Sequence, residues 1–200
     1  MKRLIGKTVL KLGGWTLVGT PPNDHRFVLI AAPHTSNWDL VYMLAFSYVT
    51  GLDLHWMGKH TLFKGPIGWC LKGLGGVPIY RDERRNMVQQ MADLFASKDK
   101  FILAIPPAGT RGYRDHWKSG FYHIANAAKV PIVGSFLDYK TRSGGYGLVL
   151  VPSGNISSDM EILRDFYDGM LGKFPENTND IRLREELSDE PSKQADDKRH

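Results

Sequence analysis

Two short runs of apolar residues constrain the fold of this chain more than any other feature of its sequence. Residues 27–31 and 101–105 are each five residues long and carry no polar side chain, and charged residues precede both of them. Continuous apolar runs of this length are typical of strands that are buried on both faces of a parallel sheet. The sequence therefore predicts a sheet with helices on both sides.

Segments with helical spacing alternate with these runs. Between residues 83 and 97 a methionine or a phenylalanine recurs at every fourth position, which predicts a helix there. Further helices are expected over residues 40–49, 121–129 and 158–167. Strands that alternate with helices predict a single α/β domain with a mostly parallel central sheet flanked by helices.

The composition excludes several classes of protein. The single cysteine, Cys70, excludes a disulfide framework and a cysteine-based zinc site, so an intracellular protein is expected. The longest uninterrupted apolar run, residues 27–33, is far shorter than the roughly 18 residues that a membrane-spanning helix needs. The N-terminus lacks the length and cleavage site of a signal peptide. These features predict a protein that is not integral to a membrane.

Charge is distributed unevenly along the chain, whose formal net charge is +5. Residues 176–200 carry eight acidic and five basic side chains, whereas residues 1–175 carry 21 basic and 13 acidic ones. We therefore expect a basic domain over residues 1–175 and a polar, flexible tail over residues 176–200. A basic domain indicates an anionic partner, such as a phosphate-bearing substrate, an anionic membrane surface or an acidic carrier protein. Nucleic acid ranks last, because no nucleic-acid-binding motif is present.

Residues 1–14 form a short basic amphipathic segment that ends at two glycines. Its apolar residues fall on one arc of a helical wheel and its basic residues fall opposite. Such a helix lies on a membrane surface or packs its apolar side on the domain, and the sequence leaves both alternatives open. The apolar, glycine-broken and basic stretch 62–74 either contacts an acyl chain or lipid, or forms ordinary core beneath a loop.

A histidine and a carboxylate follow the first apolar run. Two residues five positions apart on one helix point about 140° away from each other, so His34 and Asp39 meet only if His34 lies in the turn before the helix. A carboxylate bonded to one imidazole nitrogen leaves the other nitrogen free to accept a proton from a hydroxyl, which is the arrangement of a general base. The alternative is a loop histidine beside an aspartate that caps the helix.

Basic and glycine residues follow two further predicted strands. Arg81 ends a short strand led by two glycines, and Gly109, Thr110 and Arg111 follow the run 101–105. Ligands of α/β sheets bind at the carboxyl ends of the strands, where a guanidinium can bind a phosphate and a glycine turn can hold an oxyanion. The chain has no Gly-x-Ser-x-Gly motif and no activated cysteine context, so a covalent enzyme intermediate is not expected.

The order of these motifs resembles that of the glycerolipid acyltransferases, typified by 1-acylglycerol-3-phosphate acyltransferase. Four blocks match motifs of that family in the family's order, and a Lys-x-Gly follows the third of them. They are the His-x4-Asp block at 34–39, the glycine-led strand with arginine at 76–81, the Pro-Glu-Gly-Thr-Arg block at 107–111, with the Lys-x-Gly at 118–120 after it, and the Val-Pro-Ile strand at 130–132. The resemblance covers roughly residues 25–152.

This resemblance implies a glycerol-3-phosphate acyltransferase-like fold and direct acyl transfer. It implies that His34, oriented by Asp39, takes the proton from the hydroxyl of a lysophospholipid acceptor, and that this oxygen attacks the thioester of acyl-CoA or acyl carrier protein. It implies that the acceptor's phosphate is held by Arg81, Gly109, Thr110, Arg111 and Lys118. No metal or other cofactor is expected, and the protein is expected in the cytoplasm, peripherally associated with the inner face of the membrane.

One position departs from the family's pattern, because Ala108 stands where the third block has glutamate. A methyl group cannot accept a hydrogen bond or pair with a neighbouring arginine. A catalytically weakened or inactive protein that binds lipid or acyl carrier on the same scaffold is therefore an alternative to an active acyltransferase. A hydrolase of thioesters, in which water replaces the acceptor, is a third possibility.

Overall fold

A computed structural model describes residues 1–79 and 84–188 of the chain, and in these residues seven strands form one sheet. The strands are β1 (Thr16–Val18), β2 (Arg26–Ala32), β3 (Leu54–Lys59), β4 (Gly76–Ile79), β5 (Phe101–Ile105), β6 (Ile132–Asp138) and β7 (Ser143–Leu150). Their order across the sheet is β1-β7-β6-β2-β5-β3-β4. The five strands from β6 to β4 are parallel, whereas β7 runs antiparallel to β6. The predicted mostly parallel sheet is confirmed.

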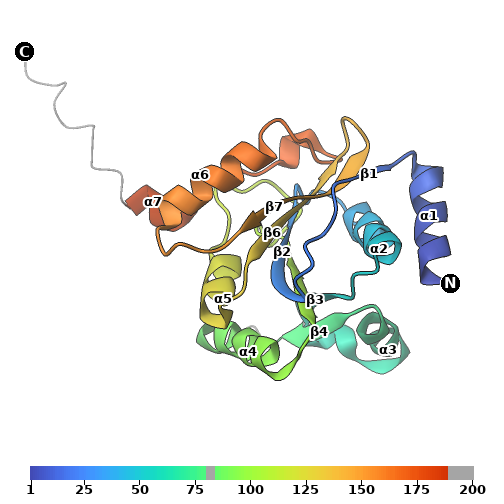
Figure 1. The fold of residues 1–200 in the computed structure, drawn as a ribbon, viewed down its shortest axis with the longest axis horizontal. Helices are drawn as coiled ribbons and strands as arrows, with labels where there is room; N and C mark the ends of the chain where they lie inside the picture. Colours follow the sequence, from blue (N-terminus) through green and yellow to red (C-terminus); the bar gives the residue numbers. More distant parts are fainter. Residues whose placement is uncertain (80–83, 189–200) are drawn as a thin grey trace, which may run out of the picture.

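Helices cover both faces of this sheet. They are α1 (Lys2–Gly13), α2 (Trp38–Thr50), α3 (Gly65–Gly73), α4 (Arg84–Ser97), α5 (Gly120–Ala128), α6 (Ile156–Tyr167) and α7 (Arg184–Ser188). Figure 1 shows α4, α5 and α6 on one side of the sheet and α1 and α2 on the other. The described part of the chain thus has three layers, with the sheet in the middle.

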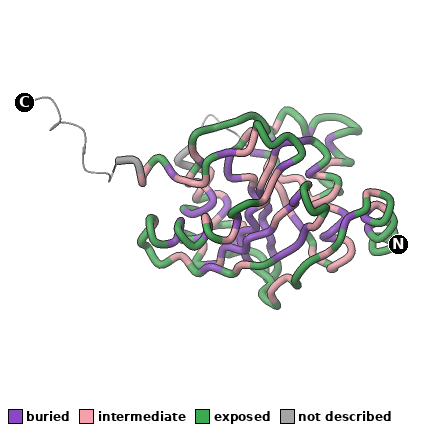
Figure 2. The backbone as a smooth tube through the Cα atoms, turned by 90° about the horizontal axis from the view of Figure 1, so that it is seen from above, coloured by how far each residue is buried: buried purple, intermediate pink, exposed green. Residues whose placement is uncertain are grey.

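The central strand β2 explains why this region of the sequence is apolar without interruption. Val28 and Ile30 face the core beneath α4, α5 and α6, and Phe27 and Leu29 face the core on the side of α2. None of the four is more than 1% exposed. Figure 2 shows the buried backbone gathered in the centre of the molecule, with α1 at the edge. A strand that is covered on both faces needs apolar residues at every position.

The N-terminal segment forms a helix that packs on α2 through Gly6 and Leu10 rather than through its predicted apolar arc. Leu10 of α1 is buried, and a methyl group at Gly6 would lie 2.6 Å from the carbonyl oxygen of Ala45 in α2. The opposite side of α1 stays apolar and exposed, because Leu4 and Leu12 are 70% and 84% accessible. Within residues 1–79 and 84–188, no helix has both the length and the apolar character needed to cross a bilayer.

The segment after residue 175 is more ordered than its polar sequence indicates. Leu183 is fully buried, and it forms an isolated bridge with Trp117. Glu186 of α7 forms an ion pair with Arg164 of α6 at 2.8 Å. The prediction that the chain is solvated from residue 176 onward is therefore wrong for this part, because two isolated apolar residues, Ile181 and Leu183, pack into the core. Residues 189–200 lie outside the described residues.

Candidate active site

The parallel pairing of three strands brings the predicted site residues to one edge of the sheet. Strand β2 lies between β5 and β6 in register, so the segments that follow these three strands leave the sheet side by side. These segments carry His34 after β2, Arg111 after β5 and Tyr139 after β6. The carboxyl edge of such a sheet is the usual place for a ligand.

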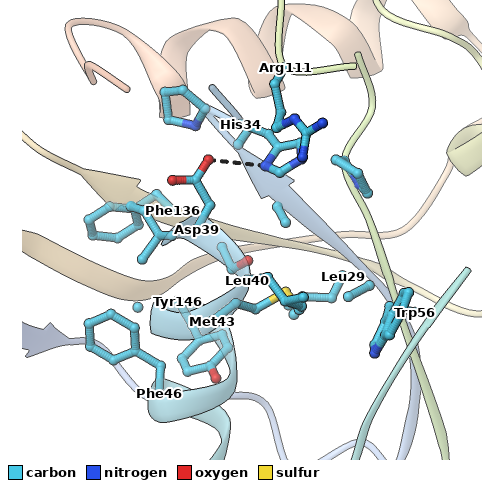
Figure 3. A pocket seen from close by; sticks show the side chains of 18 of the residues that line it. Leu29, His34, Asp39, Leu40, Met43, Phe46, Trp56, Arg111, Phe136 and Tyr146 are labelled. Atoms are coloured by element: carbon cyan, nitrogen blue, oxygen red, sulfur yellow. Dashed lines mark hydrogen bonds and ion pairs between the residues drawn. The ribbon is translucent and has the colours of Figure 1, made fainter. Parts of the chain in front are cut away.

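His34 and Asp39 form a hydrogen-bonded pair at this edge. His34 lies in the turn between β2 and α2, and Asp39 lies in the first turn of α2. The distance between His34 Nδ1 and Asp39 Oδ2 is 3.0 Å (Figure 3). The side chain of His34 is 23% exposed, and that of Asp39 is 6% exposed. The turn that the sequence requires for this contact is present.

Asp39 accepts hydrogen bonds on both of its carboxylate oxygens. Its Oδ2 accepts from the backbone N–H groups of Thr35 and Ser36, both at 2.9 Å, and its Oδ1 accepts from the Tyr139 hydroxyl at 2.7 Å. Burial raises the pKa of Asp39, but the bonds from His34, Tyr139 and Ser36 outweigh it, so the pKa lies below the ordinary value of 3.8. An ionised carboxylate is only an acceptor, so the shared proton is on His34 Nδ1 and Nε2 is left as an acceptor.

Tyr139 is a site residue that the sequence reasoning missed. It immediately follows β6, and its ring packs edge-on against that of Trp15, with ring centroids 4.9 Å apart. Burial and the bond to Asp39 raise the pKa of Tyr139, so this group stays a hydrogen-bond donor at neutral pH. Its position directly after a strand was the available signal, but a tyrosine there is ordinary in a core.

An apolar cavity of about 220 Å³ extends from the His34–Asp39 pair into the space between α2 and the sheet. Figure 3 shows its lining in detail. The side chains that line it beneath the pair include Leu29, Leu40, Met43, Phe46, Trp56, Phe136 and Tyr146. Because these side chains belong to one helix and four strands, regular elements of the fold form the cavity. Its apolar lining suits an aliphatic chain.

Of the five predicted phosphate-binding residues, the structure places one beside His34 and three elsewhere in the same loop, and the fifth is not described. Arg111 lines the cavity together with His34, and its guanidinium donates to Asn37 Oδ1. The side chain of Lys118 packs closely on Gly109 instead, since a methyl group at Gly109 would lie 2.8 Å from Lys118 Nζ. Gly109 itself has a φ of 65°, which favours glycine. Thr110 Oγ1 accepts from the backbone of Gly112 at 3.4 Å. Thr110, Gly109 and Lys118 do not line this cavity, and Arg81 lies outside the described residues.

Ala108 is a buried residue of the loop that carries these groups, between β5 and α5. It is 3% exposed and lines a second, small cavity of about 40 Å³, which also reaches His34. Thr178 lines the same cavity, and among the residues that the structure describes its buried Oγ1 has no hydrogen-bond partner. The site therefore has space beside Ala108 for a larger side chain, and the hydroxyl of Thr178 is available to bond to it.

The C-terminal segment fixes this loop by hydrogen bonds that the sequence did not indicate. The Nδ2 group of the buried Asn179 donates to the carbonyl oxygens of Gly112 and Arg114, at 3.2 and 3.4 Å. The backbone N–H of Trp117 donates to the carbonyl oxygen of Arg182 at 2.7 Å. In the described ranges, no cluster of three or more histidine, cysteine or acidic side chains is arranged to hold a metal ion.

A His/Asp pair at the carboxyl edge of an α/β sheet, at the mouth of an apolar cavity, is an arrangement suited to general-base chemistry beside an apolar ligand. Comparison with known proteins identifies the family. A family model described as Acyltransferase matches residues 19–138, which is more than half of the chain. The chain belongs to the Acyltransferase family, and the resemblance of its sequence motifs is confirmed.

Two individual proteins show the same relationship. A 1-acyl-sn-glycerol-3-phosphate acyltransferase of Streptococcus pneumoniae (strain ATCC BAA-255 / R6) is 32% identical over 115 residues, which are 56% of this chain and 42% of that protein. The chain thus spans less than half the length of this relative. The crystal structure of the 1-acyl-sn-glycerophosphate (LPA) acyltransferase PlsC from Thermotoga maritima matches with a TM-score of 0.55 and 20% identity, over 82% of this chain and 73% of that one. The second match shows that the fold is shared.

Proposed function

We propose that the protein transfers a fatty acyl chain from a thioester donor to the hydroxyl of a lysophospholipid, such as 1-acylglycerol-3-phosphate. The observation that carries this proposal is the 3.0 Å contact between His34 and Asp39 at the mouth of an apolar cavity. The relative from Streptococcus pneumoniae is named for this activity and supports the choice of acceptor. The basic character of residues 1–175 agrees with an anionic substrate.

The reaction proceeds by proton transfer and direct attack. His34 Nε2 takes the proton of the acceptor hydroxyl, while Asp39 stabilises the imidazolium that forms. The acceptor oxygen attacks the thioester carbonyl carbon, and the tetrahedral intermediate expels the thiolate. The thiolate then takes the proton from His34, so that an ester and a thiol leave and the enzyme returns to its first state. No covalent enzyme intermediate is needed.

Cationic groups near the pair hold the phosphate of the acceptor. Arg111 is the best placed of the described candidates, because it lines the same cavity as His34. We assign Arg81, Gly109, Thr110 and Lys118 to the same phosphate site. Fixing the phosphate orients the hydroxyl toward the thioester, which supplies several kcal/mol of barrier reduction in enzymes of this kind.

The apolar cavity receives the acyl chain of the donor, which is acyl-CoA or acyl carrier protein. Its walls are almost entirely apolar below the His34–Asp39 pair, and water in such a space has few hydrogen-bond partners. A chain in the cavity places its carbonyl carbon at the mouth, beside His34. The cavity thus binds and orients the donor.

Exposed apolar side chains support our proposal that the protein attaches to a membrane surface. Leu4 and Leu12 of α1 and Ile67 and Trp69 of α3 are each at least 70% exposed, and lysines accompany both helices. Apolar groups that insert among lipid headgroups, with lysines that bind anionic lipids, are typical of peripheral attachment. We propose attachment to the inner face of the membrane.

A non-catalytic lipid- or carrier-binding protein is the second candidate, and Ala108 is the observation that favours it. The buried methyl group of Ala108 forms no hydrogen bond that could hold its own loop, which also carries Arg111, in position. However, the pair of His34 and Asp39 retains the geometry of a general base, which a binding protein does not require.

Thiol release from acyl-CoA and from acyl carrier protein tests these functions. The assay is run with lysophosphatidate, with other lysophospholipids, with an aminolipid and without acceptor. Release that depends on a lysophospholipid, with the matching diacyl product, is the expected result. Release without acceptor would show a thioesterase, and tight lipid binding without release would show a binding protein. Arg111→Ala is expected to raise KM for the phosphorylated acceptor about tenfold or more, the effect of losing a charged hydrogen bond.

A further inference from the structure

We propose that a surface groove beside the site binds the phosphopantetheine arm of the acyl donor, with Lys173 as its phosphate-binding cation. This inference rests on the proposed acyltransferase function and names the place where the thiol part of the donor lies. Coenzyme A and acyl carrier protein both present the acyl group on phosphopantetheine, so the chemistry of the ligand is common to both sources.

The groove adjoins the mouth of the acyl-chain cavity. It has a volume of about 700 Å³, and Asn37 and Arg111 line both it and the cavity. Beyond these two residues the groove is lined by Trp38 and Phe174, which are 53% and 42% exposed, and by Lys173. A donor whose acyl chain fills the cavity must lead its thiol part out through this mouth.

Lys173 is fixed in position by contacts of both neighbouring residues with Thr35. The backbone N–H of Phe174 donates to Thr35 Oγ1 at 3.2 Å. On the other side, a methyl group at Gly172 would lie 2.5 Å from the same oxygen, so the backbone there packs directly on Thr35. Because Thr35 is the residue after His34, the position of Lys173 is tied to that of the general base.

The side chain of Lys173 keeps its charge available for a ligand. Its Nζ lies 5.5 Å from the ring centroid of Trp38 and 5.9 Å from that of Phe174, so two aromatic rings hold the ammonium group. In the described part of the chain, no carboxylate forms an ion pair with it, and the groove contains two cations against one carboxylate, Glu176. The exposed rings suit the methyl and amide groups of pantetheine.

The position of Lys173 favours the donor over the acceptor. In a glycerol phosphate only a few bonds separate the hydroxyl from the phosphate, so the acceptor's phosphate must lie close to His34. Arg111 meets this requirement because it lines the cavity together with His34, and Gly109, Thr110 and Lys118 belong to the same loop as Arg111. Lys173 comes from a different segment and lines only the outer groove. A cation at that place is suited to a longer ligand, whose phosphate lies far from its thioester.

A comparison of donors with and without the phosphate tests the proposal. We expect Lys173→Ala to raise KM for acyl-CoA and acyl-phosphopantetheine about tenfold, the effect of one charged hydrogen bond, and to leave KM for acyl-pantetheine and for the acceptor unchanged. Lys173→Arg should restore most of the loss. Lys98→Ala is the matched control, because Lys98 also lies over an aromatic ring, that of Phe101, 5.0 Å away, but outside the groove.

Binding of coenzyme A, measured by calorimetry, separates this inference from the proposed function, because it requires no reaction. A tenfold weaker Kd in Lys173→Ala, but not in Lys98→Ala, supports the groove even if no acyl transfer is found. If the wild-type protein transfers acyl chains and Lys173→Ala changes neither Kd nor the KM of phosphorylated donors, the proposal is overturned. An equal loss with acyl-pantetheine, or a loss confined to the acceptor, overturns it as well. The same assay with acyl carrier protein shows which carrier the protein uses.

Discussion

The hydroxyl of Tyr139 donates to Asp39 Oδ1 at 2.7 Å and joins the end of β6 to the first turn of α2. The two residues are 100 positions apart, and the bond is independent of the one between Asp39 and His34, which uses Oδ2. Each carboxylate oxygen is therefore held from a different side. A carboxylate that is fixed in this way holds the imidazole in one orientation.

Removing the Tyr139 hydroxyl is expected to slow the reaction moderately. In Tyr139→Phe, kcat should fall about threefold to tenfold with KM unchanged, because one hydrogen bond of about 0.5–1.5 kcal/mol is lost from the group that orients His34. Tyr122→Phe is the control, since Tyr122 donates at the same distance to a different carboxylate, that of Asp159. Steady-state kinetics of both variants test the role, and equal effects of the two substitutions would contradict it.

The ionised state of Asp39 makes the stability of the protein depend on pH. Because the pKa of Asp39 is lower in the folded protein than its ordinary value of 3.8, its contribution is complete above that value and is lost as the pH falls through the folded pKa. We expect wild type and Asp39→Asn to differ in free energy of unfolding by a constant amount above about pH 5, and by less below about pH 4. Urea denaturation at several pH values measures this. A difference that grows on acidification would contradict the assignment.

Restoring an acidic side chain at position 108 tests whether the alanine weakens the enzyme. The small cavity beside Ala108 contains the unused Oγ1 of Thr178, which can donate to a carboxylate. We expect Ala108→Glu to fold and to increase kcat/KM for the phosphorylated acceptor severalfold, whereas the neutral Ala108→Gln should not. Lower activity in Ala108→Glu, with an unchanged Tm, would show that the alanine is part of the working site.

Loss of the Asn179 side chain is expected to loosen the loop that carries Arg111. Asn179→Ala leaves the carbonyl groups of Gly112 and Arg114 without this donor, so amide exchange in residues 109–118 should become about tenfold faster. Asn155→Ala is the control, because Asn155 caps α6 through Ser158 at 3.1 Å and its loss lowers stability by about 1 kcal/mol elsewhere. Equal acceleration of loop exchange in the two variants would show a general loss of stability instead.

The sequence predicted the layers of the fold well, because buried parallel strands and amphipathic helices leave strong local patterns. The run 27–31 lies within β2, and the segment with four-residue spacing of apolar residues before position 98 lies within α4. The segment around Leu183 is expected to be a flexible tail, because two isolated apolar residues in a charged stretch show no helix or strand periodicity. In the structure these two residues pack into the core. Residues 65–73 form a helix in spite of their glycines, since Gly65 and Gly73 are its two terminal residues and Gly68 packs directly on the backbone of Phe63.

The candidate site was predictable where its residues are close in sequence and not where distant segments meet. His34 and Asp39 are five residues apart, and the turn between them can be inferred from local chemistry. Tyr139 reaches Asp39 only because β6 lies next to β2, and Asn179 reaches the loop only because the chain folds back after α6. No local pattern marks either residue, because each depends on the register of the sheet or on the path of a long connection.

The rate of acyl transfer by His34→Ala tests whether His34 is the general base. With the apolar cavity, Asp39 and Arg111 still in place, we expect kcat to fall about 10²- to 10⁴-fold, the usual effect of removing a general base, while the fold and the binding of donor are retained. Rates are measured with saturating acyl donor and lysophosphatidate, and circular dichroism and Tm confirm the fold. A variant that transfers acyl chains at the wild-type rate would contradict the assignment of His34 as the base.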